Sequence, residues 1–144
     1  MPAWVDTGVH EYTRRLPSEL GFELQSLPMS KRSKTKSVQN YKTEEGQVLR
    51  NAASKSTRVI AFDVTGKTLS TQMLVDKLQA WRLNGDDVSL LVGGPDGLDN
   101  DLVKSADERW SLSGLTLPHP VVRVIFVEQL YRAWSITQGH PYHR

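Results

Sequence analysis

The chain has 144 residues, which is enough for one domain with its own hydrophobic core. It contains no cysteine, and this excludes disulfide bonds and thiolate metal sites. The formal net charge is +2, and no apolar run approaches the length of a membrane-spanning helix, so we expect a cytoplasmic protein without a membrane partner.

Basic residues gather in two zones, although the whole chain is nearly neutral. No acidic residue occurs between positions 24 and 43, or after Glu128. Two local basic zones indicate contact with a polyanion. A solvated loop and a charged tail would explain the same charges equally well. The candidate RNA-binding residues of the first zone are Lys31, Arg32, Lys34 and Lys36.

The first part of the chain alternates between helical and extended patterns. Apolar residues at helical spacing predict a helix over residues 2–16. The alternating segment 22–27 predicts a strand, and the polar, basic segment 28–37 predicts a loop. A second helix is expected over 38–53, with Gly46 interrupting its pattern.

The alternation continues through the rest of the chain. The expected elements are a strand at 58–64, a helix from Ser70 or Thr71 to Leu83, a strand at 88–92, a short helix from Asp99 or Asn100 to about Glu108, a short strand and loop at 110–117, and a helix at 121–138. Continuous apolar strands separated by helices are typical of an α/β fold with a mainly parallel sheet and helices on both faces. No linker divides the chain, so we expect a single domain over residues 1–144.

The stretch SLLVGGPDGL, residues 89–98, runs an apolar strand into three glycines and a proline. Such conformational freedom indicates a sharp turn that another group approaches closely. The spacing matches neither GxGxxG nor GxxxxGK[ST], so a phosphate cradle is unsupported. Ligands of parallel sheets bind beyond the carboxyl ends of the strands, which predicts a ligand site at this edge. An ordinary strand-ending turn is equally compatible with the loop sequence alone.

The final helix carries apolar residues on almost every side. A helix that is apolar all round must be buried all round. A second copy of the chain would supply the missing cover and predicts a homodimer. A central core helix in a monomer is the alternative.

Three motifs, VGGPDGL, WSLSGLTLPHPVVRV and EQLYRAWSITQGHPYHR, closely resemble the RlmH family of ribosomal RNA methyltransferases. The resemblance covers essentially the whole chain and is strongest over 90–98 and 112–144. It implies a SPOUT-type α/β fold with a trefoil knot over about 60–144, and a homodimer. It also implies S-adenosylmethionine-dependent methylation of N3 of a pseudouridine in the large-subunit (23S) rRNA of the assembled ribosome.

The resemblance also implies where the methyl donor binds. S-adenosylmethionine carries no phosphate, so backbone amides and carbonyls at close range and apolar walls would suit it. The loop Leu112–Leu117 would wall the adenine with its leucines. The implied cofactor residues are Phe62, Gly93, Gly94, Leu112, Ser113, Gly114, Leu115, Thr116 and Leu117.

His119 lies between two prolines and is expected to handle the N3 proton or to orient the substrate. A structural histidine is the alternative. Tyr142, His143 and Arg144 are expected to hold the base or a phosphate, against the alternative of a disordered tail. No metal is expected, because the pair His140 and His143 has no obvious third ligand.

One feature departs from the family. Its chains open with an apolar strand before the first helix, and this strand is absent here. We therefore expect lower stability while the site loops are retained. Two other functions stay open: a methyltransferase of the same class acting on another RNA, such as transfer RNA, and a non-catalytic ribosome-binding module.

Overall fold

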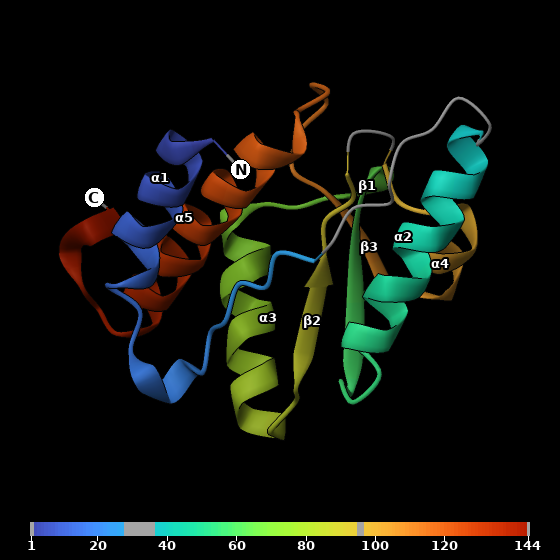
Figure 1. Ribbon diagram of the computed structural model, residues 1–144. Helices are drawn as coiled ribbons and strands as arrows, with labels where there is room; N and C mark the ends of the chain where they lie inside the picture. Colours follow the sequence, from blue (N-terminus) through green and yellow to red (C-terminus); the bar gives the residue numbers. More distant parts are fainter. Residues whose placement is uncertain (1, 28–36, 95–96, 144) are drawn as a thin grey trace. The chain divides into compact units, whose positions relative to one another are not determined.

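The computed structural model of the protein describes residues 2–27, 37–94 and 97–143 (Figure 1). The chain divides into two compact units, each assembled from segments far apart in the sequence. The first unit comprises Met1–Leu24, Leu69–Gly85 and Leu117–Arg144, and the second comprises Gln25–Thr68 and Asp86–Thr116. The single domain expected over the whole chain stays a prediction.

The second unit contains a three-stranded parallel sheet in the order β2-β1-β3 (Figure 1). The strands are β1 (Arg58–Thr68), β2 (Val88–Leu91) and β3 (Glu108–Ser111). Ala61 of β1 lies opposite Leu91 of β2 and Arg109 of β3, which fixes the register of all three strands. The α/β class and the parallel sheet predicted from the sequence are confirmed.

Strand β1 continues four residues beyond the predicted end at Val64 and is irregular there. Phe62 and Lys67 both pair with Trp110 of β3, so the segment between them bulges out of the ladder. A Cβ on Gly66 would lie 2.6 Å from the carbonyl carbon of Arg109. The bulge therefore brings the backbones of β1 and β3 so close together that a side chain at position 66 would not fit between them.

Two helices of the second unit begin at capping side chains. Helix α2 spans Val38–Ala52, and the Ser37 hydroxyl accepts a hydrogen bond from the Asn40 amide. Helix α4 spans Asn100–Ser105, and Asp99 accepts one from the Leu102 amide. Both caps satisfy amides that the helices cannot pair internally. The helices pack with the sheet around a core of Ala53, Ala61, Leu91, Leu98, Leu102 and Ala106.

The first unit is helical. It contains α1 (Ala3–Thr13), the 3-10 turns η1 (Ser18–Leu20) and η2 (Pro141–His143), α3 (Thr71–Asn84) and α5 (His119–Thr137). Helices α1 and α3 both pack against α5 (Figure 1). Helix α3 begins at the Ser70 cap and ends at Gly85, whose φ of 70° needs a glycine. These ends are the ones that the sequence predicts.

The strand predicted over residues 22–27 is wrong, because this segment forms no regular structure. Phe22 packs instead against the apolar cluster of Val5, Val9 and Val127. The first helix ends at Thr13, three residues early. The short helix ends at Ser105 because Ala106 is extended and Glu108 already pairs in β3.

Helix α5 is covered only in part within this chain. Its fully buried residues include Phe126, Val127, Leu130 and Tyr131, whereas Ile125 and Ile136 are half-buried. Among the helices that the structure describes, none is long and apolar enough to cross a membrane.

Candidate functional site

The loops that follow the three parallel strands share one edge of the sheet in the second unit. The register places the end of β2 beside Ala61, and Phe62 beside Trp110. The glycine loop (the described residues 93–94 and 97–98) and the loop 112–116 therefore follow β2 and β3 at the carboxyl edge of the sheet, and Phe62 is the last residue of β1 before its ladder with β3 becomes irregular. This is the edge where parallel sheets bind ligands.

Phe62 is held against β3 by an aromatic contact. Its ring meets that of Trp110 edge to face, with centroids 6.3 Å apart and planes at 70°. Trp110 is 1% exposed, so it fixes the half-buried Phe62 ring from the core side. The position predicted for a cofactor contact is thus rigidly supported from within the unit.

The glycine loop closes upon itself. A Cβ on Gly93 would lie 2.6 Å from the carbonyl carbon of Gly97 and 2.7 Å from the Leu98 amide nitrogen. The Gly97 amide donates to the Gly94 carbonyl at 3.0 Å, and Gly97 has a φ of 83°. The group that approaches Gly93 on its Cβ side is therefore the loop's own backbone.

Gly94 faces helix α2. A Cβ at this position would lie 3.2 Å from the Oε2 atom of Glu45. A carboxylate thus stands beside the loop, and the sequence gives no signal for it, because Glu45 lies on a separate helix about 50 residues away.

The loop after β3 is pinned at Ser113 and leaves an apolar side chain exposed. The Ser111 hydroxyl donates to the Ser113 carbonyl, and the Leu115 amide donates to the Ser113 hydroxyl, both at 2.9 Å. Leu115 is 72% exposed, and Val64 of the β1 bulge is 69% exposed. Large exposed apolar side chains beside backbone polar groups fit a ligand that has both an apolar ring and hydrogen-bonding edges.

His119 is the first residue of α5 and belongs, with Leu117, to the first unit. Burial, and then the positive charge of Arg123, lower the pKa of His119 below its ordinary value of 6.5. The imidazole is therefore neutral at about pH 7 and can accept a proton.

Tyr142 is packed against its own chain. Its ring meets the Tyr131 ring edge to face at 4.6 Å between centroids, and the Arg132 guanidinium lies 5.2 Å from its centroid. Burial and a hydrogen bond with Tyr12 raise the pKa of Tyr142 to about 12. Together with Arg15, these side chains form what we call the tyrosine–arginine cluster.

The cations of the tyrosine–arginine cluster are paired. Glu11 forms an ion pair with Arg15, and Glu128 forms one with Arg132 at 2.7 Å. The ring of Tyr142, which is expected from the sequence to help hold the base or a phosphate, contacts side chains of α5 and α1. Its position suits a residue that anchors the end of the chain.

Several predicted site residues lie outside the described part of the chain. They are Lys31, Arg32, Lys34, Lys36, Arg144 and the side chain of His143. Among the residues that the structure does describe, no cluster of three or more histidine, aspartate or glutamate side chains could hold a metal ion.

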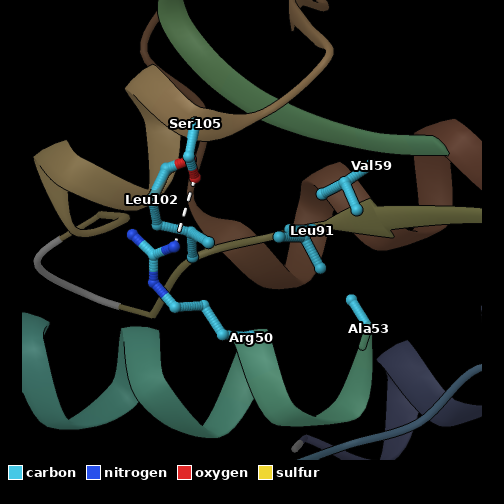
Figure 2. A pocket seen from close by; sticks show the side chains of 6 residues that line it. All are labelled: Arg50, Ala53, Val59, Leu91, Leu102 and Ser105. Carbon is cyan, nitrogen blue, oxygen red and sulfur yellow. Dashed lines mark hydrogen bonds between the residues drawn. The ribbon is translucent and has the colours of Figure 1, made fainter. Parts of the chain in front are cut away.

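A cavity of about 220 Å³ lies in the second unit, and its lining residues belong to neither the glycine loop nor the loop 112–116 (Figure 2). Arg50 reaches over it from α2 and donates to the Ser105 hydroxyl of α4 at 3.3 Å. Its walls coincide with the apolar core of this unit. The lining residues are Arg50, Ala53, Val59, Leu91, Leu102 and Ser105.

A family model described as "Predicted SPOUT methyltransferase" matches residues 1–143. The chain belongs to the SPOUT methyltransferase family. The family resemblance read from the sequence motifs is thereby confirmed.

Relatives of this SPOUT chain carry a more specific name. Proteins called ribosomal RNA large subunit methyltransferase H are 54% identical in Saccharophagus degradans and 50% identical in Hydrogenovibrio crunogenus, each over 144 residues. A protein of the same name in Hahella chejuensis is 47% identical over 144 residues. All of this chain is covered in each comparison, together with 93%, 92% and 92% of the respective relative.

Sequence reasoning did not identify every residue that shapes the site of this SPOUT methyltransferase. It missed Glu45 beside Gly94, and Gly66 against β3. It also gave Asp99 only as a candidate start of a helix, whereas the carboxylate is buried and contacts α2. The mid-helix Gly46 was the available signal, because an interior helical glycine is unfavourable without a packing reason.

Proposed function

We propose that this protein is an S-adenosylmethionine-dependent methyltransferase that modifies N3 of a pseudouridine in the large-subunit rRNA of the assembled ribosome. The observation that carries the proposal is that the glycine loop and the loop 112–116 follow β2 and β3 at the carboxyl edge of the sheet, where Phe62 pairs with Trp110. Membership of the SPOUT family and the names of the relatives support the reaction and the RNA substrate.

The methyl donor would be held by loops of the second unit. Backbone amides and carbonyls of the glycine loop and of the loop 112–116 would meet the adenine edge, which offers both donors and acceptors. Phe62 and the exposed Leu115 would supply apolar walls. When bound, S-adenosylmethionine supplies an activated methyl group, so the protein has to align the reactants and manage the proton on N3.

His119 is the proposed proton acceptor. Its lowered pKa keeps the imidazole neutral, and a neutral ring can take the N3 proton as the methyl group is transferred. General base catalysis of this kind contributes about 10²- to 10⁴-fold in rate. A positive charge near N3, from Arg144 or Arg123, would also favour loss of that proton.

The RNA contacts are proposed for the two basic zones. Lys31, Arg32, Lys34 and Lys36 would neutralise backbone phosphates, which gives salt-dependent affinity without sequence preference. Tyr142 would anchor the chain end so that His143 and Arg144 reach the base or a phosphate. Since so small a surface can read little sequence, recognition would depend on the shape of the assembled ribosome.

The remaining parts of the proposal concern assembly. We propose a cytoplasmic homodimer with a single knotted SPOUT domain per chain. The half-buried apolar residues of α5 support a second copy as cover.

A methylation assay tests the proposal. The protein is incubated with radiolabelled S-adenosylmethionine and intact ribosomes, free ribosomal RNA or transfer RNA. We expect label on the large-subunit RNA of intact ribosomes, and mass spectrometry should locate it on N3 of a pseudouridine. Transfer to transfer RNA would favour the other RNA substrate, and cofactor binding by calorimetry without any transfer would favour a non-catalytic module.

A further inference from the structure

We infer that helix α2 restrains the conformation of the glycine loop through contacts near the start of the loop, at Gly94, and directly after it, at Asp99. Gln39 and Asp99 are therefore positioning residues for the methyl-donor site. The inference rests on the proposed function in assigning the donor to this loop. All the contacts that carry it lie within the second unit.

The first contact is at Asp99, directly after the loop. Asp99 is 7% exposed, and its Oδ1 atom accepts a hydrogen bond from Nε2 of Gln39 at 3.2 Å. Its Oδ2 atom accepts one from the Leu102 amide at 3.4 Å. A buried carboxylate needs hydrogen-bond donors, and Gln39 supplies one of them to Asp99.

Gly46 shows how tightly α2 meets Asp99. A Cβ at this position would lie 2.9 Å from the Cβ of Asp99. A glycine in the middle of a helix is destabilising relative to alanine. The close approach explains why position 46 is a glycine. It also fixes the distance between α2 and Asp99, the residue directly after the glycine loop.

The second contact is at the start of the loop. The Glu45 carboxylate lies 3.2 Å from the point that a Cβ of Gly94 would occupy, and Glu45 precedes Gly46 on α2. One helix therefore bounds both Gly94 and Asp99. Between them, the Gly97 amide donates to the Gly94 carbonyl and closes the loop.

This arrangement has a consequence for binding. A loop with three glycines has many accessible conformations, and the binding-competent one must be selected at a cost in affinity. Contacts from α2 lower this cost by limiting the conformations of the free loop. Since Gln39 and Asp99 are assigned no contact with the reacting atoms, losing their contact should raise the dissociation constant of the methyl donor and leave kcat at saturation nearly unchanged.

Introducing a negative charge at Gln39, and then removing the one at Asp99, tests the inference. Gln39→Glu would set two carboxylates against each other, whereas Gln39→Glu combined with Asp99→Asn restores a donor–acceptor pair and keeps a side chain that caps α4 well. Gln47→Glu is the matched control, because Gln47 is exposed on the same helix and bonds only Asn51 among the contacts shown for it. Gln39→Leu removes the hydrogen bond without adding charge.

Two measurements are made on the full chain, after melting curves show each variant folded at the assay temperature. Calorimetry gives the S-adenosylmethionine dissociation constant, and hydrogen exchange follows the Gly97 amide without ligand. We expect Gln39→Glu to weaken binding about five- to tenfold and to speed Gly97 exchange, with the double variant near wild type and the control unchanged. Gln39→Leu should show a smaller effect in the same direction.

The outcomes separate this inference from the proposed function. Wild-type protein that binds no S-adenosylmethionine overturns the proposed function, and the positioning role falls with it. Wild-type binding that Gln39→Glu leaves unchanged, with unaltered Gly97 exchange, overturns the positioning role alone. An equal loss in the double variant would also overturn it, because the effect would then not pass through the contact with Asp99.

Discussion

His119 illustrates how burial and a neighbouring cation set the protonation state of one side chain. Its pKa lies below 6.5, so the ring is neutral at about pH 7 and becomes protonated as the pH falls through the lowered pKa. We expect kcat to decline on the acid side of about pH 6.5 because the proton acceptor is lost. The unfolded chain binds this proton more readily than the folded one, so the stability of the folded state also decreases as the pH falls below 6.5.

His119→Gln should lower kcat by about 10²-fold and remove the decline of kcat at acid pH, which we call the acid limb. It should leave the S-adenosylmethionine dissociation constant unchanged. Rates measured across pH with intact ribosomes check this, and calorimetry supplies the cofactor affinity. A variant that keeps both the wild-type rate and the acid limb would show that another group accepts the proton.

Tyr142 makes contacts within its own chain that were not predicted from the sequence. Its ring contacts Tyr131 and lies beside Arg132, so Tyr142→Ala should lower the free energy of unfolding by about 1–3 kcal/mol. Tyr142→Phe keeps both ring contacts and loses only the hydroxyl hydrogen bond, at about 1 kcal/mol. Denaturant unfolding measures both changes. If the ring anchors Arg144, turnover should fall in the alanine variant and persist in the phenylalanine variant, whereas equal turnover in both would contradict the anchoring role.

At the scale of elements, the irregular strand β1 depends on Gly66. A Cβ there would meet the backbone of Arg109 and Trp110 at 2.6–2.7 Å, and backbone cannot rotate away as a side chain can. We expect Gly66→Ala to lower the free energy of unfolding by about 1–3 kcal/mol through forced backbone shifts. Gly114→Ala is the control, because a Cβ there meets nothing within 4 Å. Equal melting temperatures for the two variants would contradict the close approach.

The helices and strands also show which local sequence signals are sufficient to predict where an element begins and ends. Ser70 and Gly85 delimit α3 as predicted, since caps act through bonds to nearby backbone groups. The alternation over 22–27 did not produce a strand, because a strand needs a neighbouring strand and Phe22 found an apolar cluster instead. Local pattern therefore located the helix starts well, although α1 and α4 end about three residues before their predicted ends, whereas strand formation depended on long-range pairing.

For the molecule as a whole, helix α5 is the surface through which we propose that two chains associate. Ile125 and Ile136 are half-buried and lie on one face, since their spacing is about three helical turns. We expect the wild-type protein to sediment as a dimer and Ile125→Arg to sediment as a monomer, because a charge on a covered apolar face must be desolvated. A wild-type monomer at assay concentration, with full activity, would contradict the homodimer.

The fold class, most helix starts, the family and the loops of the candidate site could be predicted from the amino-acid sequence. These properties reside in local patterns: apolar periodicity, caps, and motifs whose residues are contiguous. What each loop residue contacts could be known only from the folded chain, such as Gly93 against Gly97, Glu45 beside Gly94, and Asp99 against Gly46. The reason is physical, since a contact between elements depends on how the packed chain brings distant segments together, and a spacing along the sequence does not encode that distance.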